Sequence, residues 1–83
     1  MRANRAFHLT VTREGLEPAF LADPRRLDRI EVVSIDNGEV VLYWDLPAKR
    51  ASKLLKSLRT DLVNLAADDF IATWEGADVE GDL

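Results

Sequence analysis

His8 is the only histidine in the chain and the first residue to consider for acid–base or metal chemistry. Imidazole titrates near neutral pH and is a common metal ligand. The chain has no cysteine to supply a thiolate, and its carboxylates follow no recognisable ligand spacing. His8 alternates with apolar residues, so we expect it on the outward side of a strand, exposed or packed against a partner. This interpretation is favoured over a catalytic or metal-binding role.

The remaining polar residues do not form a known catalytic pattern. Asp68 and Asp69 could bind a hard cation, but their position at a helix end favours a water-exposed stop signal. The glycines form no phosphate-binding loop, and no serine lies in a glycine-flanked nucleophile elbow. No stretch matches a recognisable family motif. The sequence therefore predicts no enzyme, no cofactor and no metal site.

Basic residues are concentrated in one block, where they could contact an acidic partner. Residues 46–60 hold five cations and no acid, whereas 61–83 hold seven acids and no base. A cationic face can follow a phosphate backbone or an acidic protein surface, or it can simply be solvated. The net charge of −4 and the lack of aromatic residues among the cations disfavour nucleic acid. The five cations are Lys49, Arg50, Lys53, Lys56 and Arg59, which Arg25, Arg26 and Arg29 could extend.

These cations require a helix to align them on one face. Over residues 47–67, leucines recur at helical spacing on one side, and the basic residues occupy the other. A continuation of the same helix would place Asp69 among the leucines and Phe70 among the cations. The helix is therefore predicted to end near Ala67 or Asp68, and residues 70–75 are predicted to form a final strand.

Three earlier segments have the pattern of strands. Phe7, Leu9 and Val11 alternate with polar residues over 6–12, as in a half-buried strand. Two β-branched runs, 29–36 and 39–45, flank Asn37-Gly38, a pair typical of a two-residue hairpin turn. A two-residue turn would place Ile35 opposite Val40 and Val33 opposite Leu42. The stretch between the first two strands has no sustained period, although Asp23-Pro24 could begin one helical turn.

Both faces of the predicted hairpin are apolar, so both need cover. With that register, one face would carry Val33, Ile35, Val40, Leu42 and Trp44. The other face would form an association surface, and a two-fold homodimer is the commonest way to cover it. Alternatively, Leu16, Phe20 and Leu21 from the irregular connection could fold over it. The association surface consists of Ile30, Val32, Val41 and Tyr43.

The chain of 83 residues, 47% of them hydrophobic, is predicted to be one small soluble α+β domain over 1–76 with an acidic tail over 77–83. The expected order is strand, loop, hairpin, helix and strand: an antiparallel sheet of about four strands with one long helix on one face. No apolar run is long enough for a membrane span, and the cytoplasm is the default compartment. We expect a non-enzymatic interaction or regulatory module, homodimeric through its outer sheet face, with an acidic protein partner for its helix. The alternative is a nucleic-acid-binding protein that uses the basic face of helix 47–67.

Overall fold

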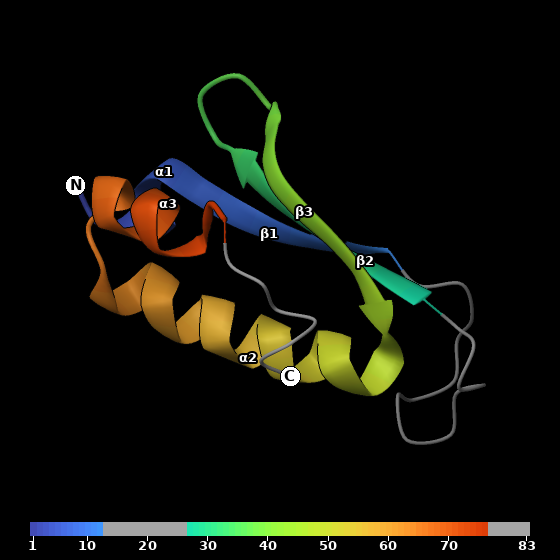
Figure 1. Cartoon of the computed structure of the whole chain (residues 1–83). Helices are drawn as coiled ribbons and strands as arrows, with labels where there is room; N and C mark the ends of the chain where they lie inside the picture. Colours follow the sequence, from blue (N-terminus) through green and yellow to red (C-terminus); the bar gives the residue numbers. More distant parts are fainter. Residues whose placement is uncertain (13–26, 77–83) are drawn as a thin grey trace.

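The computed structural model describes residues 1–12 and 27–76, which form a sheet with helices on one side (Figure 1). The α+β class is as predicted, but the described residues form three antiparallel strands rather than four, in the order β1-β2-β3. The elements are α1 (Ala3–Ala6), β1 (Phe7–Thr12), β2 (Leu27–Ser34), β3 (Val40–Pro47), α2 (Ala48–Asn64) and α3 (Ala67–Trp74).

The β2–β3 turn is longer than the predicted two-residue turn. The Ser34 amide donates to the Glu39 carbonyl at 2.8 Å, and the Gly38 amide donates to the Ser34 carbonyl at 2.8 Å. Gly38 has a φ of 72°, whereas no non-glycine residue in the described part of the chain has a positive φ. A two-residue type I′ turn needs positive φ at both central positions. Asn37 does not have a positive φ, so the turn is not of this type.

The longer turn changes the strand register, and the predicted pairing is therefore wrong. Val33 faces Val40, and a bulge then brings Val32 opposite Leu42. A slip of one residue moves a strand's side chains to the other face of the sheet. Ile30 and Val32, predicted on the outer face, are fully buried on the helical side.

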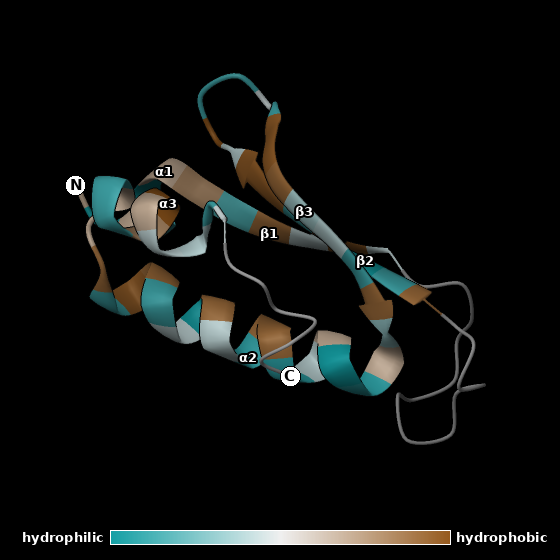
Figure 2. Ribbon diagram, viewed as in Figure 1, coloured by the Kyte–Doolittle hydropathy of each residue, from teal (hydrophilic) through white to brown (hydrophobic). Residues whose placement is uncertain are grey.

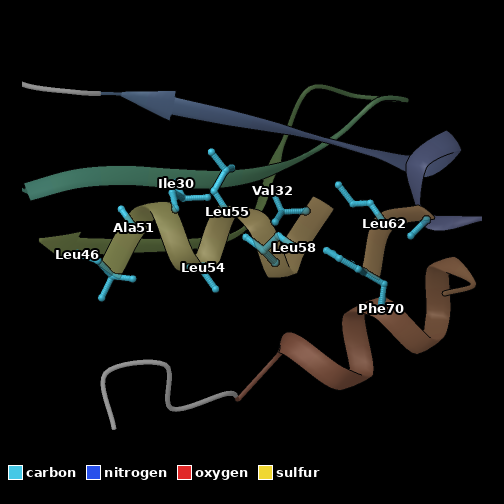
Figure 3. Close-up of a cluster of buried hydrophobic side chains, with 10 residues drawn as sticks. Ile30, Val32, Leu46, Ala51, Leu54, Leu55, Leu58, Leu62 and Phe70 are labelled. Carbon is cyan, nitrogen blue, oxygen red and sulfur yellow. The ribbon is translucent and has the colours of Figure 1, made fainter. Parts of the chain in front are cut away.

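Helix α2 forms as its leucine spacing predicts, and it supplies half of the buried residues of the core cluster (Figure 3). Leu54 and Leu58 are fully buried, and they pack in one cluster with Ile30 and Val32 of β2. The other buried α2 residues in this cluster are Ala51, Leu55 and Leu62. The position of this stripe leaves the opposite, cationic side of α2 facing away from the sheet.

Helix α2 ends at Asn64, before the predicted end near Ala67, because the N-terminal segment binds the chain there. The Ala3 amide donates to the Leu65 carbonyl at 2.9 Å, and the Ala67 amide donates to the Met1 carbonyl at 2.9 Å. Leu65 is extended, with φ −101° and ψ 153°. The short helix α1, which the sequence analysis did not predict, positions these N-terminal groups.

Residues 67–74 form helix α3, so the predicted final strand is wrong. The extended residues 65–66 reset the helical phase, which places Phe70, Ile71 and Trp74 on one side of a new helix. Phe70 is fully buried and stacks on Phe7, with ring centroids 5.9 Å apart.

Asp68 and Asp69, interpreted from the sequence as a helix stop, lie in the first turn of α3. Carboxylates are favourable there because the helix dipole is positive at that end.

No helix in the described ranges is long and apolar enough to cross a membrane. Three other predictions lie outside the described residues: the cover by Leu16, Phe20 and Leu21, the turn at Asp23-Pro24, and the acidic tail 77–83.

Candidate interaction surfaces

The outer face of the sheet, which faces away from the helices, has a polar end formed by an ion pair. Arg29 of β2 lies directly opposite Asp45 of β3. Its Nε donates to Oδ1 at 2.9 Å, and its Nη2 donates to Oδ2 at 3.0 Å. This two-bond contact lowers the pKa of Asp45 and raises the pKa of Arg29, mainly through the hydrogen bonds. The guanidinium carbon also lies 5.0 Å from the ring centroid of Tyr43.

The other end of the hairpin carries exposed apolar side chains, which we call the hairpin patch. The turn projects away from the helical layer in Figure 1, and apolar residues flank it in Figure 2. A protein surface with neighbouring large apolar side chains usually marks a contact site. The hairpin patch consists of Ile35, Val40, Val41 and Tyr43, which are 50%, 46%, 42% and 60% exposed.

The predicted association surface is divided by the observed register. Val41 and Tyr43 are exposed and belong to the hairpin patch. Ile30 and Val32 belong to the core, so they cannot contact a partner without unfolding. Sequence reasoning missed Ile35 and Val40 because the two-residue turn assigned both to the covered face.

His8 lies on β1 opposite Val33, and its side chain is exposed as predicted. In the ranges that the structure describes, no three His, Asp or Glu side chains gather to hold a metal ion. Val33, the residue opposite His8 on β2, is apolar, so the imidazole has no acidic residue directly across the strand pair.

The basic face of α2, which we define as Lys49, Arg50, Lys53, Lys56 and Arg59, is present as predicted. Four of these side chains are exposed, and Arg50 is partly buried. Within residues 1–12 and 27–76, none of the five makes an ion pair or a side-chain hydrogen bond. No described residue therefore competes with an external partner for these charges.

Arg29 does not extend this basic face. It lies on the outer side of the sheet, paired with Asp45, whereas α2 covers the inner side. Arg25 and Arg26, the other predicted extensions, fall outside the described residues. Of the three predicted extensions, the one that the structure describes, Arg29, thus lies apart from the basic face.

A groove of about 410 Å³ lies between α2 and α3. Trp74 closes one side of it, and the indole Nε1 donates to Oδ2 of Asp61 at 3.0 Å. The same ring meets Trp44 edge-on, with centroids 6.1 Å apart. The sequence analysis missed this groove because it placed Trp74 on a strand. The lining residues are Lys56, Ser57, Thr60, Asp61 and Trp74.

No protein-family model, curated protein or solved structure matches this chain. Its function must therefore be inferred from its own surfaces. These surfaces are the hairpin patch, the basic face of α2 and the groove beside Trp74.

Proposed function

We propose that the protein is a small non-enzymatic interaction module that forms a homodimer through the outer face of its sheet. The observation that carries this proposal is the hairpin patch, whose four large apolar side chains are each about half exposed. Burial of such side chains is favourable, by about 1.5–3 kcal/mol for a fully exposed one and correspondingly less here. The patch therefore supplies the driving force for association.

A second copy is the partner that this surface fits best. A two-fold axis lets one patch cover itself, and neither copy then exposes it. The neighbouring charges of Arg29 and Asp45 neutralise each other. The basic face of α2 lies on the opposite side of the molecule, so its cations do not meet across the interface.

The acidic turn sets the relative direction of the two hairpins. Asp36 and Glu39 flank the turn, and both are exposed. Two turns placed together would bring like charges into contact, which is unfavourable. We therefore propose that the hairpins lie antiparallel, so that each turn approaches the Arg29 end of the other copy.

The absolute mass in solution tests this proposal. Light scattering on a sizing column should give twice the chain mass at both low and high salt, because apolar contacts are not screened by ions. A dilution series should then reveal the monomer. A chain mass at both salts and at every concentration would contradict the homodimer.

A second candidate function is carried by the exposed cations of α2. We propose that this basic face contacts an acidic protein partner, since five charges that pair with no described residue, all on one rigid helix, attract and orient an anionic surface. Nucleic acid is the alternative ligand for the same face. Asp61 on the groove side favours protein, because a phosphate backbone would place a negative charge against it.

Binding to immobilised polyglutamate and to random-sequence DNA separates these ligands. The acidic-partner proposal expects retention on polyglutamate that decreases with salt, and little retention on DNA at the same salt. Stronger retention on DNA, with a steep dependence on salt, would favour the nucleic-acid alternative.

A further inference from the structure

We propose that the groove between α2 and α3 binds an acidic peptide segment of a partner protein. An apolar residue of that segment contacts Trp74, and its carboxylates contact Lys56 and Lys53. This inference deepens the second candidate function, on which it rests, by placing the acidic partner at one site. The groove of about 410 Å³ has room for one or two side chains.

Trp74 is a preorganised contact for an apolar side chain. The indole is held by its hydrogen bond to Asp61 at 3.0 Å and by its edge contact with Trp44. It remains only partly buried, so part of the ring faces the groove. A fixed aromatic ring loses little conformational entropy on binding, and tryptophan is among the residues most enriched at interface hot spots.

Two hydroxyl groups line the groove and can bond to a peptide backbone. Ser57 is exposed, and its hydroxyl makes no hydrogen bond with any residue that the structure describes. The Thr60 hydroxyl donates to the Lys56 carbonyl at 3.1 Å and keeps acceptor capacity for a ligand N–H. A peptide segment offers both donors and acceptors along its backbone, as this lining requires.

The charges on the groove define the direction of the ligand. Lys56 lies on one rim, and Lys53 lies one helical turn closer to the start of α2. Asp61 lies about one and a half turns further along α2, beside the Trp74 indole, and repels a carboxylate. The apolar residue of the ligand therefore belongs beside Trp74 and Asp61, and the acidic residues belong beside the two lysines.

The same asymmetry favours a peptide over a phosphate backbone. A nucleic acid carries a negative charge at every step, so it would place one against Asp61 as well as against Lys56. A peptide can carry an uncharged residue at that point. The site thus selects a segment in which an apolar residue is adjacent to acidic ones.

The test uses the full chain and two short capped peptides. One peptide has a single leucine among glutamates, and the other has serine in place of that leucine. The indole N–H signal of Trp74, assigned from its loss in Trp74→Phe, reports occupancy by NMR. We expect a saturable shift with the leucine peptide and at least about fivefold weaker binding of the serine peptide, since one buried apolar side chain supplies 1 kcal/mol or more.

A matched pair of charge reversals locates the site. Lys56→Glu, on the groove, should weaken binding of the leucine peptide by about tenfold, whereas Arg59→Glu should weaken it by less than about twofold. Arg59 is exposed on the same helix but is not among the groove residues. Equal losses in both variants, with no preference for leucine, would overturn the groove while leaving a diffuse acidic-partner function intact.

Two other results would also overturn the proposal. If neither peptide binds, both the proposed peptide site in the groove and the proposed acidic-partner function are wrong. Neutralisation of the acids in residues 77–83, by Asp78→Asn, Glu80→Gln and Asp82→Asn, should leave affinity for the leucine peptide unchanged. A gain of about tenfold would instead identify the chain's own segment as the occupant, because a competing intramolecular ligand would have been removed.

Discussion

The indole N–H of Trp74 donates to Oδ2 of Asp61 at 3.0 Å, which joins α3 to α2 across the extended residues 65–66. The bond is partly buried and its acceptor is a carboxylate, so it fixes the angle between the two helices more firmly than a solvent-exposed contact would. Together with the edge contact to Trp44, this hydrogen bond positions the Trp74 ring in the groove.

Trp74→Phe should therefore destabilise the domain. It keeps an aromatic ring but removes the hydrogen bond to Asp61, which should lower the free energy of unfolding by about 1–2 kcal/mol. Urea denaturation followed by circular dichroism measures this change. Thr73→Ala, at an exposed position in the same helix, is the control and should change stability by less than about 0.5 kcal/mol. Equal stabilities of the two variants would mean that the hydrogen bond does not hold α3 in place.

Phe70→Ala tests whether α3 is part of the core. Phe70 is fully buried and stacks on Phe7. Its truncation should cost about 3–5 kcal/mol, enough to unfold much of a domain of this size at room temperature. A loss below about 1 kcal/mol, measured by urea denaturation, would show that residues 67–74 do not pack as the structure has them.

The strongest local patterns in the sequence predict their elements well. The leucine spacing predicts α2, and the alternation of Phe7, Leu9 and Val11 predicts β1. Asn37-Gly38 predicts the hairpin but not its register, because only Gly38 takes a positive φ. Because the predicted register was wrong by one residue, Ile30 and Val32 were assigned to the association surface, although they belong to the core.

The features that the sequence did not predict, the α2–α3 break, helix α3 and the groove, depend on contacts between distant parts of the chain. The break between α2 and α3 is stabilised by two backbone hydrogen bonds, one from the Ala67 amide to the Met1 carbonyl and one from the Ala3 amide to the Leu65 carbonyl. No local pattern near residue 65 encodes these bonds, so the helical phase of 67–74 could not be predicted. The groove beside Trp74 depends on that phase and was missed for the same reason.

Asp45→Asn should alter the dependence of stability on pH. The hydrogen bonds from Arg29 lower the pKa of Asp45 below its ordinary value of 3.8. The folded state therefore gains stability from the charged carboxylate above pH 3.8, and this gain is lost as pH falls through the lowered value. The raised pKa of Arg29 has no effect in this range, since the guanidinium stays charged.

Urea midpoints between pH 6 and pH 2 measure this effect, with the protein diluted to the monomer. The wild type should be more stable than Asp45→Asn at the upper end, and the difference should shrink toward the lower end. A constant difference across the range would indicate that the ion pair does not form in solution.

Lys49→Glu combined with Lys53→Glu should abolish retention on polyglutamate. Both lysines are exposed and pair with no residue in the described ranges, so their reversal changes the charge of the basic face without removing a core contact. The thermal midpoint of the double variant should stay within a few degrees of the wild type. Undiminished retention would show that the basic face of α2 does not form the acidic-partner site.

The homodimer is tested most directly by the mass of Tyr43→Asp beside that of Val63→Asp. Both replace an exposed apolar side chain, 60% and 58% exposed, but Tyr43 lies in the hairpin patch and Val63 lies on α2. We expect Tyr43→Asp to be a folded monomer and Val63→Asp to remain a dimer by light scattering at the same concentration. A dimeric Tyr43→Asp, or two variants of equal mass, would contradict association through the outer face of the sheet.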